Sequence, residues 1–162
     1  MHVDSYRFLP RSFRSGYELP QTDEPPVWAP FLPRLADATI TLLTSAGLYD
    51  SDTQPSFDLD RERSEPTWGD PTHRFIDHGR TNLAMAHLHV NNADILADHE
   101  VALPRRCLDR LVDAGVVGAA SSQHVSVMGY QGDLTTWSEQ TAPAITARCR
   151  AQGTDGIVLA PV

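Results

Sequence analysis

Short apolar segments of strand character alternate along this chain with segments of helix character, and this alternation limits the folds that it can adopt. Strands are predicted in ATITLLT, RFIDH, NLAMAHLHV, HVSVMGY and GIVLAPV, which are residues 38–44, 74–78, 82–90, 124–130 and 156–162. Helices are predicted at 103–115, with proline in the first turn and Gly115 as the stop, and at 132–153, between Asp133 and Gly153 with a kink at Pro143. Strands that are apolar on both faces, the last one included, predict a layered single α/β domain with a mainly parallel sheet.

A proline-rich segment, residues 1–33, precedes this pattern. Its six prolines disfavour helices and strand ladders, so we expect an extended N-terminal arm, followed by the α/β domain at residues 34–162. The arm also carries eight large apolar side chains, which are unusual in a segment that stays exposed to water: Tyr6, Phe8, Leu9, Phe13, Tyr17, Val27, Trp28 and Phe31. We therefore predict that it packs over the domain or across the interface of a homodimer.

The composition excludes several classes of protein. Hydrophobic residues make up 41% of the 162 residues and charged residues 21%, which is typical of a globular domain. A formal charge of −8 would repel phosphate backbones, so no nucleic-acid partner is expected. No apolar run is long enough to span a membrane and the first residues lack the apolar segment of a signal peptide, so a cytoplasmic protein without a membrane partner is expected. Cys107 and Cys149 lie among apolar helix positions and are predicted to be buried, inert thiols.

The stretch MAHLHVNNADILADHE, residues 85–100, concentrates groups that bind metals or move protons. Alternation along 83–90 places His87 and His89 side by side at the carboxyl end of their predicted strand, where sheets of this kind build their sites. Two imidazoles at this spacing suit a divalent metal such as zinc or iron, with Asp94, Asp98 or His99 as a further ligand.

A metal-free alternative is that His87 or His89 shuttles a proton, with Asp98 as a catalytic carboxylate. A structural alternative remains open, in which both histidines are amphipathic residues that finish a strand. For Asp94 and Asp98 the competing role is capping a helix.

Other residues are weaker candidates for holding a small polar substrate. Thr44 and Ser45 end a predicted strand in TSAG and offer hydroxyl groups and free amides for a carboxylate, although a plain turn explains them equally well. His124 would join the polar cluster if its strand neighbours the histidine strand. The glycine-containing turn MGYQGD (128–133) lacks the character of a phosphate cradle, because Asp133 would occupy the amides that an anion needs, and no nucleotide cofactor is expected.

Taken together, several stretches resemble the glycine/sarcosine/betaine/D-proline reductase selenoprotein B family. The similarity runs through VWAPFLPRLADATITLLTSAGLY, GDPTHRFI, HLHVNNADILADHEVALP, RLVDAGVVG, SVMGY and DGIVLAPV, and covers about residues 27–162. The resemblance implies an α/β protein related to enzymes that reductively cleave a C–N bond in small amino-acid-derived molecules. It also implies a reactive selenocysteine or cysteine just after the strand GIVLAPV, and this sequence ends there, at Val162.

Three explanations of that ending stay open: a natural short relative, a UGA codon read as a stop, and a fragment of a longer protein. The sequence thus predicts a small-molecule enzyme without the redox nucleophile, acting through its histidine and aspartate pocket, such as a metal-dependent lyase or hydrolase. The alternative is a non-catalytic binding or partner subunit of a reductase-like complex.

Overall fold

The structure is a computed structural model of the chain, and it describes residues 29–162. Residues 31–162 form one compact unit. The predicted arm, residues 1–33, lies outside the described residues except for its last few positions, so its packing and the homodimer stay predictions. No helix in the described part of the chain is both long and apolar enough to cross a membrane.

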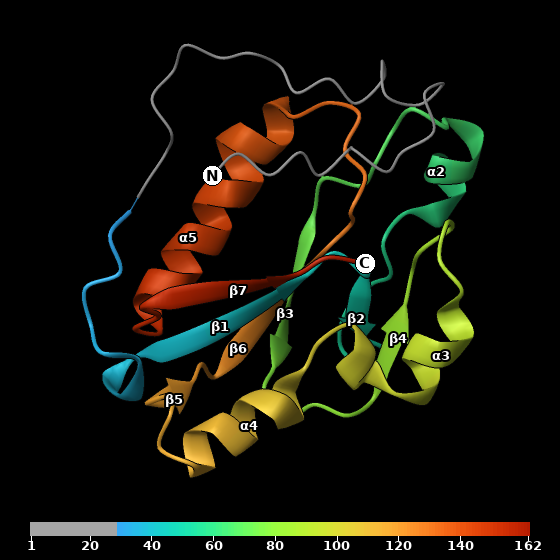
Figure 1. Cartoon of the computed structure of the whole chain (residues 1–162). Helices are drawn as coiled ribbons and strands as arrows, with labels where there is room; N and C mark the ends of the chain where they lie inside the picture. Colours follow the sequence, from blue (N-terminus) through green and yellow to red (C-terminus); the bar gives the residue numbers. More distant parts are fainter. Residues whose placement is uncertain (1–28) are drawn as a thin grey trace, which may run out of the picture. The chain divides into compact units, whose positions relative to one another are not determined.

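A five-stranded, mainly parallel sheet forms the centre of this unit, as the sequence predicts (Figure 1). Its strands are β1 (Thr39–Thr44), β3 (His73–Asp77), β5 (Ala119–Ala120), β6 (Gln123–Val127) and β7 (Gly156–Ala160). Strand β1 pairs in parallel with β7 along one edge, and along its other edge with β5 at its start and β6 at its end. Strand β3 pairs antiparallel with β6 and completes the sheet.

Helices cover both faces of this sheet, which gives a three-layered α/β unit. The helical elements are η1 (Leu35–Asp37), α2 (Leu59–Ser64), α3 (Asn92–Ala97), η2 (His99–Val101), α4 (Arg105–Asp113), the π-helical segment η3 (Trp137–Thr141) and α5 (Ala142–Ala151). Ile145 of α5 packs with Val125 of β6, whereas Leu108 of α4 packs in a separate core cluster with Ile40 of β1. Because successive residues of a strand point to opposite faces, the central strands can contribute to the cores on both sides of the sheet.

The two predicted helices end where the sequence indicates. Gly115 after α4 and Gly153 after α5 both have positive φ, 68° and 71°, which a residue without Cβ adopts at no steric cost. The predicted kink at Pro143 takes the form of the π-helical segment η3, which ends just before this proline. Proline has no N–H to donate, so it is tolerated in the first turn of α5 but not deeper in a helix.

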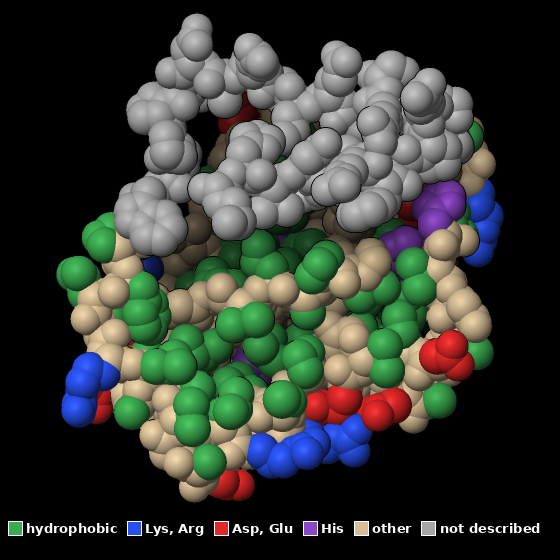
Figure 2. Space-filling view, viewed as in Figure 1, with side chains coloured by type: hydrophobic (Ala, Val, Ile, Leu, Met, Phe, Trp, Pro, Cys, Tyr) green, Lys and Arg blue, Asp and Glu red, His purple; other side chains and the backbone are tan. Residues whose placement is uncertain are grey.

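Two predictions about strands are wrong. The segment 82–90 is not one strand: β4 spans only Leu83–Met85, because its sole partner in the described region, β2 (Leu48–Asp50), is equally short and pairs with it in a separate antiparallel sheet. His87 and His89 therefore lie beyond the end of a strand. The final strand β7 is not buried either, since Leu159 is 67% exposed. Figure 2 shows apolar side chains gathered over this part of the surface. The prediction of a buried thiol is likewise wrong for Cys107, which is exposed on α4, whereas Cys149 is buried.

Candidate functional site

His124 closes a gap in the hydrogen-bond ladder of the central sheet. Strand β1 pairs with β5 at Thr39 and Ile40 and with β6 only from Leu43 onward, so the Leu42 amide has no strand partner on that edge. The fully buried His124 ring takes this position, and its Nδ1 accepts the Leu42 N–H at 3.1 Å. A side chain thus replaces a backbone carbonyl, which satisfies an amide that would be costly to leave unpaired.

This bond fixes the direction of a longer hydrogen-bonded chain. Because the Leu42 amide can only donate, neutral His124 carries its proton on Nε2 and donates it to Nδ1 of His78 at 2.7 Å. His78 in turn carries its proton on Nε2, which lies 2.8 Å from Oδ1 of Asp109. Burial, with the nearby His78 and Arg105, lowers the pKa of His124 to about 4. His124 is therefore neutral at pH 7, and the chain runs from the core to the Asp109 carboxylate.

Helix α4 and the turn after β3 position the outer members of this chain. Asp109 lies one helical turn after Arg105, so both side chains project from the same face of α4. Arg105 is 8% exposed, and its Nη1 donates to the carbonyl oxygens of Asp77, His78 and Arg80. The helix thereby holds the backbone of the turn that carries His78.

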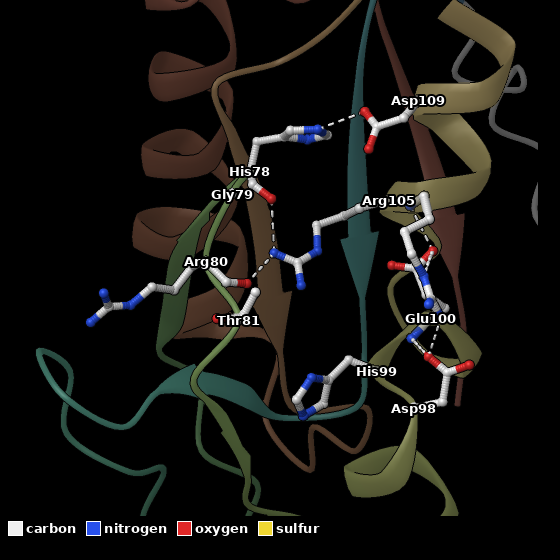
Figure 3. Close-up of a pocket in the computed structure, with 10 residues that line it drawn as sticks. His78, Gly79, Arg80, Thr81, Asp98, His99, Glu100, Arg105 and Asp109 are labelled. Carbon is white, nitrogen blue, oxygen red and sulfur yellow. Dashed lines mark hydrogen bonds and ion pairs between the residues drawn. The ribbon is translucent and has the colours of Figure 1, made fainter. Parts of the chain in front are cut away.

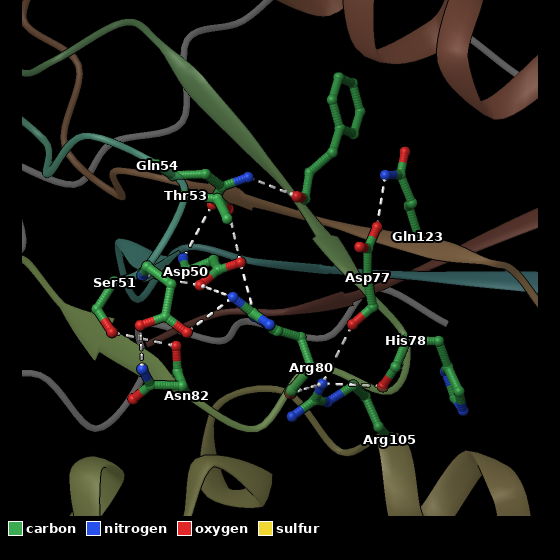
Figure 4. A network of polar contacts seen from close by, with 12 residues as sticks. Asp50, Ser51, Thr53, Gln54, Asp77, His78, Arg80, Asn82, Arg105 and Gln123 are labelled. Atoms are coloured by element: carbon green, nitrogen blue, oxygen red, sulfur yellow. Dashed lines mark hydrogen bonds and ion pairs between the residues drawn. The ribbon is translucent and has the colours of Figure 1, made fainter.

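The side chain of Arg80 anchors the same turn from the other side (Figure 4). Its guanidinium group lies 2.7 Å from a carboxylate oxygen of Asp50 and 2.8 Å from one of Asp52, and Asn82 also donates to Asp52. The hydrogen bond from Arg80 is the main reason that the pKa of Asp50 falls to about 2. Asp50 is consequently ionised at any ordinary pH.

A cavity of about 360 Å³ opens beside His78 and Asp109 (Figure 3). Residues 78–81, residues 98–100 and three side chains of α4, those of Arg105, Arg106 and Asp109, line it. Figure 3 shows the Arg80 side chain directed away from this cavity. The Asp109 side chain is 48% exposed and the His78 side chain 28%, so solutes in the cavity can reach both groups.

Charge along the rim of the cavity is largely paired. Arg106 lies 2.6 Å from Asp98 and 3.8 Å from Glu100, and Glu100 also accepts the Arg106 backbone N–H at 2.6 Å. Three buried nitrogens of the lining residues have no hydrogen-bond partner among the described residues: Nε of Arg80, Nε of Arg105 and Nε2 of His99. Nε of Arg80 still lies 2.7 Å from a carboxylate oxygen of Asp50, whereas the other two have no charged partner in that part of the chain.

The structure brings only some of the predicted site residues together. His124 belongs to the hydrogen-bonded chain, and Asp98 lines the cavity, where it also accepts the Glu100 N–H at the start of η2. Asp94 is exposed in the first turn of α3, whose cap is Asn91.

His87 and His89 do not line the cavity. Their ring centroids lie 6.2 Å apart, and Nδ1 of His87 accepts the backbone N–H of His89. Burial, with the neighbouring His89, lowers the pKa of His87. No group of three or more metal-binding side chains occurs among residues 29–162, and a metal at these histidines stays a prediction.

Thr44 and Ser45 make local contacts at the end of β1. Thr44 Oγ1 accepts the Ala46 N–H, and Ser45 Oγ accepts the Val162 N–H at 2.9 Å. Neither lines the cavity, so the hydroxyl groups lie apart from the His78–Asp109 pair.

Sequence reasoning missed His78, Arg105 and Asp109. The four-residue spacing of Arg105 and Asp109 in a predicted helix was visible, and it places both residues on one face. His78, however, meets them only because β3 runs antiparallel beside β6, which the sequence pattern did not indicate.

Comparison with known proteins gives one distant relative. D-proline reductase subunit gamma of Acetoanaerobium sticklandii is 28% identical over 137 residues, which are 83% of this chain and 53% of that protein. The chain is a distant relative of that reductase subunit. It spans about half the length of the curated relative it matches. No protein-family model matches the chain, and no solved structure matches it.

Proposed function

We propose that the cavity beside His78 binds a small amino-acid-derived molecule, and that Asp109 is the group that exchanges a proton with it. The distant relationship to a D-proline reductase subunit supports a role in a reductase-like system. The observation that carries the proposal is the chain of hydrogen bonds from the Leu42 amide through His124 and His78 to Asp109.

This chain of hydrogen bonds orients Asp109 and does not conduct protons through the protein. Its inner end is a backbone amide, which cannot supply a proton, so His124 and His78 are positioning residues. His78 holds Oδ1 of Asp109, whereas Oδ2 has no hydrogen bond within the described part of the chain. A carboxylate fixed on one side and open on the other suits a base, or a receptor for an ammonium group.

In this function the protein binds the substrate and transfers a proton, and another component of the reductase-like system supplies the electrons. D-Proline, glycine and sarcosine carry a basic nitrogen, and a reaction at that nitrogen requires a proton to be taken up or returned; the quaternary nitrogen of betaine exchanges no proton. Asp109 would supply this step because both ring nitrogens of His124 and of His78 are already hydrogen-bonded, whereas Asp109 keeps Oδ2 free of hydrogen bonds within the described part of the chain.

Isothermal titration calorimetry with D-proline, glycine, sarcosine and betaine tests this function. We expect at least one compound to bind with proton uptake or release, seen as a different apparent enthalpy in buffers of different ionisation enthalpy. Asp109→Asn preserves the acceptor for His78 but removes the charge and the base, and it should weaken binding by at least about tenfold.

Asp113→Asn is the matched control, since it removes an exposed carboxylate from the same helix. Equal affinities of the two variants, or no binding by any compound, would contradict the proposal.

A second candidate function is that of a partner subunit in a reductase-like complex. The observation in its favour is the outer strand β7, on which Ile157, Val158 and Leu159 are 41%, 49% and 67% exposed. Exposed apolar residues on a strand of this kind are typical of a protein-binding edge. Co-purification of a reductase component with the full chain, lost on Val158→Lys substitution, would favour this role over an independent enzyme.

A further inference from the structure

Arg105 is a buried cation without an anionic partner. Its side chain is 8% exposed, and among residues 29–162 it forms no ion pair with a carboxylate, unlike Arg80 and Arg106. Burial lowers its pKa, and the nearby charges of Glu100 and Asp109 oppose that effect without contacting it. A guanidinium group stays charged in proteins, so this burial is costly unless a counter-anion is bound.

One edge of the Arg105 guanidinium has no hydrogen-bond partner among the described residues. Nη1 is occupied by backbone carbonyl groups, but Nε is buried with no partner, and Nη2 makes no hydrogen bond in the part of the chain that the structure describes. Nε and Nη2 lie on the same edge of the group, and this edge donates two parallel hydrogen bonds to a carboxylate. Arg105 therefore holds the turn through Nη1 alone, and its Nε–Nη2 edge, which could bind a carboxylate, has no partner in this part of the chain.

His99 offers a second unpartnered nitrogen in the same cavity. Its Nε2 is buried without a hydrogen bond, and the ring lies with the Arg105 guanidinium in the space between residues 78–81 and α4 (Figure 3). Buried polar atoms without partners are uncommon in folded proteins, and Arg105 and His99 place two of them in side chains that line the same cavity. A molecule with adjacent acceptor oxygens would satisfy both.

We propose that Arg105 and His99 bind the carboxylate group of a small carboxylic acid. In this arrangement the carboxylate accepts from the unpaired Nε–Nη2 edge of Arg105 and from His99, while an amino group on the same molecule faces Asp109. The orientation of the amino group rests on the proposed function, but the carboxylate site does not. A cavity of about 360 Å³ is at the small end of ligand pockets, which suits a molecule the size of a single amino acid.

Titration of the full chain with acetate, acetamide, inorganic phosphate and D-proline, followed by NMR, tests the carboxylate site. We expect acetate and D-proline to shift the His99 ring signals and to bind at least about tenfold more tightly than acetamide, because acetamide lacks the charge. Acetamide binding as tightly as acetate, or no binding of acetate, would overturn the proposal. Phosphate binding as tightly as acetate would overturn the assignment to a carboxylate.

Two variants with a control locate the site. Arg105→Lys keeps the charge but loses the forked edge, and it should weaken acetate binding by about tenfold or more. Arg110→Lys makes the same change at an exposed position of α4 and should leave binding unchanged. If Arg105→Lys does not fold, His99→Asn decides: a loss of about tenfold supports the site, and unchanged acetate affinity overturns it.

These experiments distinguish a failure of the carboxylate site from a failure of the proton-exchange role of Asp109. Asp109→Asn should weaken D-proline binding but leave acetate binding unchanged, because acetate has no amino group. If acetate binds and D-proline is insensitive to Asp109→Asn, the carboxylate site stands and the proton-exchange role of Asp109 fails.

Discussion

Two pairs of histidines in this protein differ in how they are brought together. His87 and His89 are two residues apart in the sequence, yet their rings share no hydrogen bond and their centroids lie 6.2 Å apart. His78 and His124 are 46 positions apart, and their ring nitrogens lie 2.7 Å from each other. Two histidines that are close in the sequence lie on one segment without a hydrogen bond between their rings. The network of His124, His78 and Asp109 forms only where β3, β6 and α4 meet.

The two pairs should therefore respond differently to substitution. The largest effect is expected for His124→Leu, which leaves the Leu42 amide and Nδ1 of His78 without partners. Each unpaired buried group costs about 1–3 kcal/mol, so we expect the free energy of unfolding to fall by about 3 kcal/mol in urea denaturation. A decrease below about 1 kcal/mol would show that the network contributes little to stability.

Acid should destabilise the protein through the buried His124. The pKa of His124 is about 4 in the folded protein, against 6.5 for an unperturbed histidine, so the unfolded chain binds more protons between these values. Stability then falls as the pH drops from about 6.5 to about 4, by about 3 kcal/mol for this group. Urea denaturation at several pH values measures the slope, and His124→Leu should reduce it.

Part of the slope will persist in that variant, because burial also lowers the pKa of His73 and His87. Asp50 acts in a separate window: its pKa is lowered, so its contribution is present above about 3.8 and is lost only as the pH falls toward 2. An unchanged slope between pH 6.5 and 4 after His124→Leu would contradict the assignment to His124.

A smaller effect is expected for Asp98→Asn. Asparagine caps about as well as aspartate, so the start of η2 should survive, and only the exposed ion pair with Arg106 is lost. Such pairs contribute at most about 1 kcal/mol, which thermal unfolding can measure. If Asp98 is instead a catalytic carboxylate, as the sequence predicts, activity would disappear while the melting temperature stays within a few degrees.

The smallest effect on stability is expected for the double change His87→Asn and His89→Asn. Neither ring forms a hydrogen bond with another side chain among the described residues, so the free energy of unfolding should change by no more than about 0.5 kcal/mol for each residue. Metal analysis of untagged protein, before and after the change, tests the predicted metal site. Bound zinc or iron that disappears in the double variant would favour that site.

The sequence predicts the parts of this fold that depend on local patterns. Apolar runs locate β1, β6 and β7, and proline and glycine locate the ends of α4 and α5. It fails where the outcome depends on a distant partner. Strand β4 stops at Met85 because β2 is short, and β7 pairs on one edge only within the described residues and leaves Leu159 67% exposed. An apolar run predicts that a strand forms, but it does not predict the position of that strand in the sheet.

The candidate site shows the same division. The sequence predicts that His124 joins the polar cluster if its strand neighbours the histidine strand, but that strand, β4, lies in a separate sheet, and His124 on β6 meets His78 after β3 instead. The role of Arg105 could not be read from the sequence, because it depends on carbonyl groups of a turn some 25 residues earlier in the chain. Contacts between residues so far apart in the chain leave no recognisable pattern in the local sequence.

The bond between Leu42 and His124 makes the network observable without any ligand. The links from Leu42 to His124 and from His124 to His78 both join two nitrogen atoms through a shared hydrogen. In protein labelled with ¹⁵N, each of these links has a magnetic nucleus at both ends, so scalar couplings across them can be recorded. The Leu42 amide resonance therefore serves as a built-in reporter of the protonation of a histidine in the core.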